Sequence, residues 1–295
     1  MTWNTRWIFA ASMALFVCSA TGLVWGGISD ERSPTFLGTE QPRVGMHNDL
    51  PGISFEENYK RFGFDSEVFR AAMKGLEMKE DDATLTNVSS EGRMSKLEEG
   101  RLDMVVASFS ITPERMKVID FAGPYATTYQ GFLVGPEGAG IKELSDLSGK
   151  IVCSWEGSTS EEVLRRFELA DIEARTLLDA SDCVQQLREG KADAVFTDQM
   201  ILHGFADLHT ADGLRVVPGL TIGGPQHWGI GLPKGHRTDC LRLREIVKDY
   251  VTGSQWKDDF KAWLPGIPAQ DPAWIGDYRP SPAAIDARSC RDSIP

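Results

Sequence analysis

The sequence predicts an α/β protein with two similar lobes that face each other across a ligand cleft. Residues 97–105 read LEEGRLDMV and residues 187–195 read LREGKADAV, so five positions match at a constant offset of 90. In each copy a glycine ends a helix, a short basic turn follows, and an apolar strand enters a parallel sheet. Polar residues follow each strand: Ser108 and Ser110 after the first, Thr197 and Asp198 after the second. Ligands collect beyond the carboxyl ends of strands in open α/β sheets, so two such lobes would bring these residues together.

The first lobe is predicted to begin with a short strand and two helices. Residues 43–46 form the strand, and residues 47–52 form a loop. A helix introduced by Gly63 carries an apolar stripe with helical spacing. The members of this stripe are Val68, Phe69, Ala72, Met73 and Leu76. A second helix, around residues 92–99, precedes the strand of residues 104–109.

The stretch ASFSITPERMKVIDFAGPY, residues 107–125, is predicted to carry an anion site. A helix starts at Pro113, because Thr112 is a good N-cap and proline suits the first helical position. Arg115 lies in the first turn of this helix. Free backbone N–H groups, hydroxyl groups and a guanidinium therefore converge at one place, and this combination suits a carboxylate. The alternative is an ordinary capped helix with a surface arginine.

The second lobe is predicted to have a similar helix start. Residues 151–155 form a strand, and a loop with the sequence EGST leads into a helix. Thr159 and Glu162 have the spacing of a capping box. Gly157 allows close approach of the backbone, so the amides near Ser158 and Thr159 would face a carboxylate. The alternative is an ordinary strand-to-helix turn with a good cap.

The remaining elements return the chain to the first lobe. A helix follows Asp198, and a strand is expected at residues 214–218. The apolar strand of residues 228–232 crosses back, and residues 239–264 form helices. Residues 265–295 are rich in proline and polar residues, so we expect this tail to wrap the surface.

The composition favours a soluble globular protein. The chain has 295 residues, of which 41% are hydrophobic and 25% charged, and this length supports two lobes with real cores. The formal net charge is −12, and an acidic chain repels the phosphate groups of nucleic acids and anionic membranes. We therefore predict no nucleic-acid partner, and the sequence indicates no cofactor.

Residues 1–28 are predicted to be a signal peptide or a membrane anchor, and residues 29–41 a polar linker. The run of residues 8–28 has no charged residue, and about 20 uncharged residues can span a bilayer. A cleaved signal peptide uses a shorter apolar segment, and lipidation at Cys18 is the third possibility. All three routes place the bulk of the protein outside the cytoplasm, at the cell surface or anchored to the membrane.

Four cysteines remain when Cys18 is set aside: Cys153, Cys183, Cys240 and Cys290. An even number of cysteines in an exported protein indicates two disulfides. The sequence alone allows three pairings, and we favour Cys153 with Cys183 and Cys240 with Cys290. The spacings fit neither a zinc site nor a CxxC redox motif, so no metal is predicted.

Several segments together resemble the polar-amino-acid solute-binding proteins of bacterial ABC importers. They include GFDSEVFRAAMKGL, TPERMKVIDFAGPY, LREGKADAVFTDQ and WGIGLPKGH, in family order over roughly residues 43–265. The match looks closest to the actinobacterial glutamate-binding branch, which similarly has cysteines at the positions of Cys153 and Cys183. The resemblance implies a two-lobed periplasmic-binding-protein-like fold of type II and a Cys153–Cys183 disulfide.

The resemblance also implies roles for the polar residues of both lobes. The arginine of the TPER motif, Arg115, would clamp the α-carboxylate of an amino acid. The backbone near Ser158 and Thr159 would close on the same carboxylate. The groups that would hold the α-ammonium belong to Ser108, Ser110 and Asp198. A bidentate guanidinium suits a planar carboxylate, and a carboxylate with neutral acceptors suits an ammonium.

The side chain of the ligand would meet a further set of residues. Arg93 stands where dicarboxylate-binding relatives have an arginine that reaches the side-chain carboxylate, although a solvated helix residue is the alternative. His47 and Asp49 border the expected pocket. His47 departs from the lysine-like residue that is usual in the glutamate-binding branch.

We predict that residues 42–131 and 228–265 form lobe 1, residues 132–227 form lobe 2, and residues 266–295 form a C-terminal tail. The expected function is the capture of an amino acid, glutamate or aspartate first, by a monomer that delivers it to ABC permease subunits. No enzymatic activity is predicted.

Two other functions remain open at this point. A membrane-tethered amino-acid sensor would use the same pocket. The fold also resembles the cyclohexadienyl dehydratases, which need a general acid in the cleft, and Glu156 or His47 would be the candidates.

Overall fold

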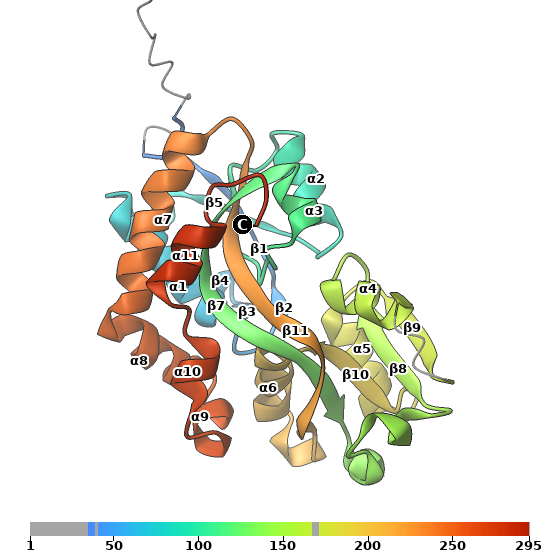
Figure 1. The fold of residues 1–295 in the computed structure, drawn as a ribbon. Helices are drawn as coiled ribbons and strands as arrows, with labels where there is room; N and C mark the ends of the chain where they lie inside the picture. Colours follow the sequence, from blue (N-terminus) through green and yellow to red (C-terminus); the bar gives the residue numbers. More distant parts are fainter. Residues whose placement is uncertain (1–34, 39–40, 167–170, 295) are drawn as a thin grey trace, which may run out of the picture. The chain divides into compact units, whose positions relative to one another are not determined.

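The predicted apolar strands assemble into one eight-stranded mixed sheet (Figure 1). The computed structural model describes residues 35–38, 41–166 and 171–294, so the prediction for residues 1–28 and part of the predicted linker lie outside the described residues. The strand order is β5-β1-β6-β11-β7-β10-β8-β9. The strands are β1 (Arg43–Met46), β5 (Thr84–Asn87), β6 (Met104–Val105), β7 (Ile119–Val134), β8 (Ile151–Trp155), β9 (Glu173–Leu177), β10 (Ala194–Asp198) and β11 (Arg215–Pro233).

Each end of this sheet is a small parallel α/β unit, as the internal repeat predicted. β1 lies parallel to β5 and β6 at one end, and β8 lies parallel to β9 and β10 at the other. Gly100 and Gly190, which match in the repeat, have φ angles of 64° and 67°. This left-handed conformation ends the preceding helix in both copies. The predicted α/β class with two similar halves is therefore confirmed.

Two long antiparallel strands, β7 and β11, join the two halves (Figure 1). β7 pairs with β10 through residues 130–133, and β11 pairs with β6 at Gly231. The strands predicted separately at residues 214–218 and 228–232 are both parts of β11. The pairing of β11 with β7 shifts register at three places, and such irregularities bend a strand, which lets one strand serve both halves.

The helices cover the sheet with their apolar faces. The predicted stripe of α1 is buried in the core at Val68, Phe69, Ala72 and Met73. The helices before the tail are α1 (Phe64–Gly75), α2 (Gly92–Glu98), α3 (Pro113–Met116), α4 (Thr159–Arg166), α5 (Ala180–Arg188), α6 (Gln199–Leu208), α7 (Arg237–Thr252) and α8 (Ser254–Trp263). Short 3-10 turns occupy Glu80–Asp82, Pro136–Gly140, Leu144–Leu147 and Thr210–Asp212. No helix of the described residues is both long and apolar enough to span a membrane.

A small antiparallel sheet follows β1 where the sequence predicted only a loop. It consists of β2 (Asp49–Leu50), β3 (Ser54–Glu57) and β4 (Lys60–Phe62). Asn58 and Tyr59 turn the chain between β3 and β4 with φ angles of 50° and 61°. Tyrosine is an unusual residue for this left-handed conformation, so the turn lacked the glycine signal that normally predicts a hairpin.

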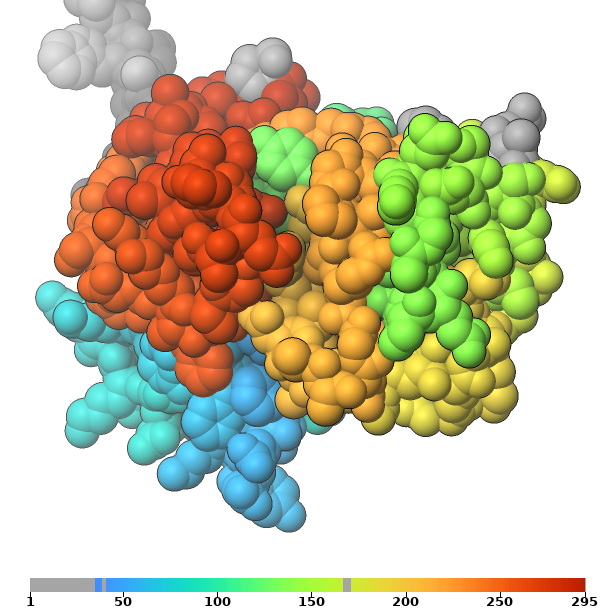
Figure 2. Space-filling model, turned by 90° about the horizontal axis from the view of Figure 1, so that it is seen from below, coloured from blue at the N-terminus to red at the C-terminus, as the bar shows by residue number. Residues whose placement is uncertain are grey.

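The C-terminal tail does more than wrap the surface, which corrects the prediction. It forms α9 (Gly266–Gln270), α10 (Trp274–Tyr278) and α11 (Pro282–Arg288). Trp274 and Tyr278 are buried against the core formed with α8, and Ile285 is fully buried. Figure 2 shows these helices in red beside the orange strand β11, with a groove of about 350 Å³ between them. The helices are too short for a periodic pattern to reveal them, and the proline content masked the buried aromatic residues.

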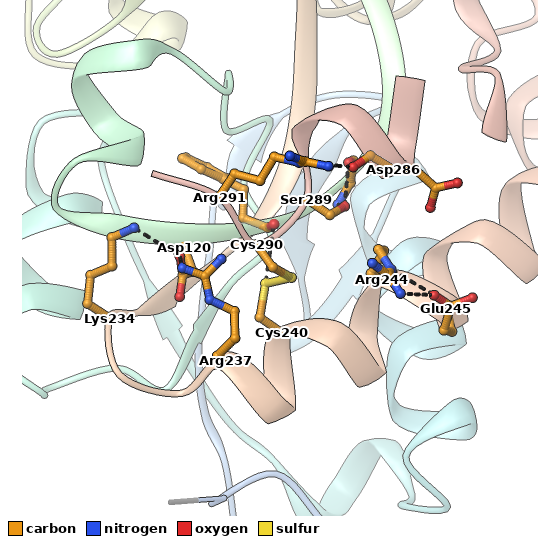
Figure 3. Close-up of a disulfide and its surroundings, with 12 residues drawn as sticks. Asp120, Lys234, Arg237, Cys240, Arg244, Glu245, Asp286, Ser289, Cys290 and Arg291 are labelled. Carbon is orange, nitrogen blue, oxygen red and sulfur yellow. Dashed lines mark hydrogen bonds and ion pairs between the residues drawn. A yellow bond between two sulfur atoms is a disulfide. The ribbon is translucent and has the colours of Figure 1, made fainter. Parts of the chain in front are cut away.

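A disulfide fastens the end of the tail to α7, and three hydrogen bonds fasten it to β7 (Figure 3). The sulfur atoms of Cys240 and Cys290 lie 2.07 Å apart, and those of Cys153 and Cys183 lie 1.99 Å apart, so both favoured pairs are at disulfide distance. The Cys290 amide donates to the Phe121 carbonyl over 2.7 Å. The Ser289 hydroxyl bonds both the amide and the carbonyl of Gly123, at 2.9 and 2.7 Å.

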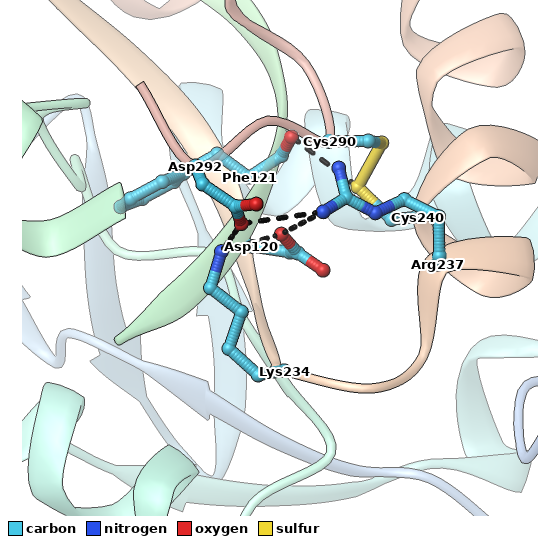
Figure 4. A network of polar contacts seen from close by, with 7 residues as sticks. All are labelled: Asp120, Phe121, Lys234, Arg237, Cys240, Cys290 and Asp292. Carbon is cyan, nitrogen blue, oxygen red and sulfur yellow. Dashed lines mark hydrogen bonds and ion pairs between the residues drawn. A yellow bond between two sulfur atoms is a disulfide. The ribbon is translucent and has the colours of Figure 1, made fainter. Parts of the chain in front are cut away.

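An ion-pair network covers this anchor (Figure 4). Asp120 on β7 is only 1% exposed and lies 2.9 Å from Lys234 and 3.5 Å from Arg237. Asp292 contacts the same two cations at 2.6 and 3.4 Å. Because Asp120 is buried between two cations, its charge is compensated, and the tail is held by both covalent and ionic contacts.

We expect the Cys240–Cys290 bridge to stabilise the fold measurably. Replacing both residues, Cys240→Ser with Cys290→Ser, should lower the free energy of unfolding by roughly 2–4 kcal/mol, because the unfolded chain gains the entropy of an open loop. Urea titration of the oxidised protein and the double variant measures this loss. Hydrogen exchange should show lost protection in α10 and α11 and retained protection in α4 and α5. Equal unfolding midpoints would contradict the anchoring role.

Candidate functional site

The polar residues that follow β6 and β10 meet at one narrow cavity of about 10 Å³. One wall comes from the β1–β6 half of the sheet and the other from the β8–β10 half. The lining residues are Ser90, Arg93, Ser108, Ser110, Trp155, Ser158, Thr159, Ser160, Thr197, Asp198 and Ile201. A wider groove lies near Gly135 and Asp193, but the polar residues that follow β6 and β10 do not line it.

Arg115 bridges the two walls. The Thr112 hydroxyl accepts a hydrogen bond from the Arg115 amide over 3.3 Å, so α3 begins with the predicted cap and with Pro113 in its first turn. The guanidinium donates to the Ser110 carbonyl over 3.0 Å and to the Gly157 carbonyl over 2.9 Å. Burial lowers the pKa of Arg115 to about 10, which leaves it positively charged at neutral pH.

Arg93 lines the cavity and is only 3% exposed, whereas Arg115 lies next to the cavity and does not line it. The alternative of a solvated helix residue is therefore wrong for Arg93. Its Nη1 atom donates to the Ala107 carbonyl and lies 3.3 Å from Nε2 of His47. Its guanidinium carbon lies 4.3 Å from the ring centre of Phe109. Burial, followed by the charge of Arg115, lowers the pKa of Arg93 well below its usual value.

Neither guanidinium has an anionic partner among the residues that the structure describes. Every described hydrogen bond of Arg93 and Arg115 goes to a carbonyl oxygen or to a histidine nitrogen. The Nε atom of Arg93 is buried and makes no hydrogen bond in the described structure. A buried cation without a counter-charge is costly, so this arrangement is suited to an anionic ligand.

Asp198 supplies the negative group of the cavity. It ends β10, and its Oδ2 atom accepts a hydrogen bond from the Trp228 indole over 2.7 Å. Its Oδ1 atom has no hydrogen-bond partner among the described residues. Burial raises the pKa of Asp198 to about 6, while the side chains of Trp228 and Gln130 and the charges of Arg93 and Arg115 act in the opposite direction. One carboxylate oxygen is therefore held by the protein and the other is left for a ligand.

A cluster of hydroxyl groups forms the wall at the start of α4. The Ser160 hydroxyl donates to the Ser158 hydroxyl over 3.0 Å and lies 3.2 Å from that of Thr197. The Ser158 hydroxyl caps α4 by accepting from the Glu161 amide over 3.0 Å. The predicted capping box at Thr159 and Glu162 is thus wrong by one residue, because Ser158 takes the cap position.

Asp65 fixes the turn that presents Ser108. Its two oxygens accept hydrogen bonds from the Ser108 amide over 2.7 Å and from the Tyr125 hydroxyl over 2.8 Å. Ser108 has a φ angle of 43°, which serine adopts only when its surroundings hold it there. Burial raises the pKa of Asp65 to about 7. Sequence reasoning missed this residue, because its contacts lie about 40 to 60 positions away.

Asp49 lies outside the cavity, so its predicted role as a ligand contact is replaced by another. Its Oδ2 atom accepts hydrogen bonds from the hydroxyl and amide of Ser181 on α5, at 3.2 and 3.4 Å. The contact joins β2 to the opposite half of the molecule. The Trp155 indole donates to the Ser90 hydroxyl over 3.3 Å and makes a second such connection.

Gly157 and Glu91 make a close approach between the two halves of the molecule. A Cβ atom placed on Gly157 would lie 2.5 Å from Cα of Glu91, well inside contact distance. Gly157 also has a φ angle of 71°, so glycine is required here on two grounds. The sequence prediction at Gly157 concerned a carboxylate that approaches the amides near Ser158 and Thr159, whereas the neighbour that requires glycine in the described structure is the backbone of Glu91.

The chain is similar to several proteins that bind amino acids. The family of bacterial extracellular solute-binding proteins, family 3, matches residues 43–202. The glutamate-binding protein GluB of Corynebacterium efficiens is 30% identical over 261 residues, which cover 83% of this chain and 85% of that protein. The ABC transporter glutamine-binding protein GlnH of Bacillus subtilis is 28% identical over 209 residues, with coverage of 70% and 74%.

A solved structure extends the similarity to the fold. An ancestral arginine-binding protein bound to arginine matches with a TM-score of 0.68 at 28% identity, covering 76% of this chain and 98% of that one. The chain therefore resembles binders of differently charged amino acids over the same two-lobed fold.

Removing the Trp228 indole donor should show how much this hydrogen bond stabilises the buried Asp198 carboxylate. We expect Trp228→Phe to lower the free energy of unfolding by about 1–3 kcal/mol at pH 7, because an ionised buried group loses its hydrogen bond. Since the folded pKa of Asp198, about 6, lies above its ordinary value of 3.8, the group is largely neutral at pH 5 and the loss should be smaller there. Urea unfolding at both pH values measures the difference.

Trp155→Phe is the matched control for this prediction. It also removes one indole hydrogen bond, but its acceptor is the neutral hydroxyl of Ser90. Its cost should not change between pH 5 and pH 7. A Trp228→Phe cost that is the same at both pH values would show that the indole does not stabilise the ionised carboxylate.

Proposed function

Since the chain belongs to the bacterial extracellular solute-binding proteins of family 3, we propose that it captures an acidic amino acid, glutamate or aspartate, for an ABC importer. It is a solute-binding protein for amino acids, and the identity of the amino acid is the open question. The charges of the cavity carry this proposal.

Glutamate and aspartate complement those charges. Each has two carboxylates and one ammonium. The cavity offers the Arg93 guanidinium and one carboxylate oxygen of Asp198, and the Arg115 guanidinium lies beside it on the carbonyls of Ser110 and Gly157. Glutamine would leave one guanidinium without a counter-charge, and arginine would add a third cation. The ligand class that satisfies all three protein groups is therefore an acidic amino acid.

The roles of the individual residues follow from their positions. We assign the α-carboxylate to Arg115 and to the start of α4 at Ser158 and Thr159. We assign the α-ammonium to the free oxygen of Asp198, and the side-chain carboxylate to Arg93. The polar groups of Ser108 and Ser110, on the wall that carries Arg93, complete the ammonium site.

Ligand capture would involve closure of two lobes about β7 and β11. Our lobe boundaries are residues 42–131 with 228–265 for the first lobe and residues 132–227 for the second. The close approach of Gly157 to Glu91 and the contact of Asp49 with Ser181 would form only in the closed arrangement. A closed, monomeric protein outside the cytoplasm would then present both lobes to the permease subunits.

The placement of the candidate general acids supports binding rather than dehydration. Glu156 is exposed and does not line the cavity. His47 lies behind Arg93, and burial lowers its pKa to about 3, so it has no proton to give at neutral pH. The relatives named above are binding proteins by name.

A tethered sensor would use the same site, and no contact in the described structure favours it.

Calorimetric titration of the purified protein with glutamate, aspartate, glutamine and arginine tests the proposal. The two acidic amino acids should bind most tightly. Arg115→Ala should weaken their binding by at least about 100-fold, since a buried carboxylate loses its charged partner. Arg166→Ala, at an exposed position of α4, is the control and should bind normally. Tightest binding of glutamine or arginine, or normal affinity in Arg115→Ala, would contradict the proposal.

Closure can be tested with two glycines of the same conformation. Gly157 and Gly149 have φ angles of 71° and 70°, but a Cβ atom on Gly149 has no neighbour within 4 Å. Alanine at either position should cost about 1–2 kcal/mol of stability through the left-handed backbone. Only Gly157→Ala should also weaken ligand binding, by about tenfold or more, because the closed contact with Glu91 costs extra free energy. Equal affinities of the two variants would show that the contact does not contribute to binding.

A further inference from the structure

A buried histidine stands behind Arg93, and we infer that His47 sets the preference of the site for a charged side-chain carboxylate over an amide. The inference rests on the proposed function and adds a positioning residue to it. His47 follows β1 and is 4% exposed, yet it does not line the cavity. Its Nε2 atom lies 3.3 Å from Nη1 of Arg93. The histidine therefore acts on a ligand only through the guanidinium.

The backbone of His47 is held independently of Arg93. The His47 carbonyl accepts hydrogen bonds from the Ser54 hydroxyl over 2.5 Å and from Nη1 of Arg61 over 2.9 Å. Arg61 is itself 5% exposed and pairs with Glu56 at 3.2 Å. These contacts fix the backbone of His47, and the burial of its side chain restricts the ring beside the arginine.

The contact requires a neutral imidazole with its lone pair at Nε2. A guanidinium only donates hydrogen bonds, so Nε2 must accept, and the ring proton must reside on Nδ1. The charged groups that face the ring are Arg93 and Arg61, and both disfavour a protonated histidine. Burial, together with these two cations, lowers the pKa of His47 to about 3, and the backbone carbonyls of Val88 and Ala107 act in the opposite direction.

A neutral acceptor orients Arg93 without cancelling its charge. The guanidinium is held by Nε2 of His47, by the Ala107 carbonyl and by the ring face of Phe109, none of which carries a charge. A carboxylate at position 47 would orient the same group but would neutralise it inside the protein. With histidine, the missing counter-charge must come from the ligand, and an amide side chain cannot supply it.

Two substitutions at position 47 separate orientation from charge. His47→Gln keeps a neutral acceptor on a flexible side chain, whereas His47→Glu supplies an acceptor with a negative charge. Calorimetry with L-glutamate and L-glutamine gives the ratio of the two affinities for each protein. The wild-type protein and His47→Gln should both prefer glutamate. His47→Glu should lose about 100-fold of that preference, chiefly through weaker glutamate binding, because a charged hydrogen-bonded contact is lost.

The outcomes distinguish this inference from the proposed function. A wild-type protein that prefers glutamine overturns both. A wild-type protein that prefers glutamate, together with an unchanged ratio in His47→Glu, overturns the role of His47 alone. Loss of the preference in His47→Gln as severe as in His47→Glu also overturns it, because the charge would then not be the cause.

A measurement on the unaltered protein covers the case in which His47→Glu does not fold. The ¹⁵N NMR spectrum of histidine-labelled protein reports the tautomer of each ring, and the spectrum of His47→Gln assigns the signal of His47. A neutral ring with its proton on Nδ1 from pH 5 to pH 8 supports the inference. A ring that is protonated at pH 5, or one with its proton on Nε2, overturns it.

Discussion

Two guanidinium groups that make no direct ion pair among the described residues are the constraint on which the site depends. Arg93 and Arg115 lie on the same aromatic ring, with guanidinium carbons 4.3 and 5.1 Å from the ring centre of Phe109. Each is held by neutral acceptors, so both keep their charge and their orientation. The charge of Arg115 disfavours the charged form of Arg93, and the Phe109 ring that both groups contact attracts each of them without neutralising either. The stability that this arrangement costs is regained when an anion binds.

The rest of the fold serves to bring one anionic group to these two cations from the other half of the sheet. The internal repeat places β6 and β10 so that their polar ends meet, and β7 and β11 connect the two halves. Asp198 reaches the cavity from the second half, with one oxygen held by an indole from β11. The connecting strand β11 thus contributes to the site itself, and the position of Asp198 depends on this strand.

Local signals predicted the parts of the site that depend on short stretches of sequence. The cap at Thr112 and the proline that follows it predicted α3 and the place of Arg115. The repeat predicted the meeting of Ser108 with Asp198, because matched motifs reveal matched topology. The sequence did not predict the contact of Trp228 with Asp198 or that of Asp65 with Ser108, because these partners are distant in the chain and share no pattern.

Other errors came from signals that were weak or ambiguous. The cap of α4 was predicted at Thr159 rather than Ser158, because three consecutive hydroxyl residues compete for the position. Asp49 was predicted at the pocket because it is near His47 in sequence, but β2 directs it to Ser181 instead. The tail helices have five to seven residues each, which is too short for hydrophobic periodicity to be recognised.

The fastening of the tail to β7 also has a consequence for the order in which the protein is completed. The strand that continues from the Arg115 helix obtains its partners at Gly123 from Ser289, a residue 166 positions later in the chain. A contact of such long range forms only after the intervening chain is available, and non-local contacts form slowly. During synthesis the half that carries Arg115 would therefore exist for a time without these hydrogen bonds at Gly123. The residues that complete this part of β7 lie near the C-terminus, so the β7 segment next to Arg115 acquires its last contacts only after Ser289 has been synthesised.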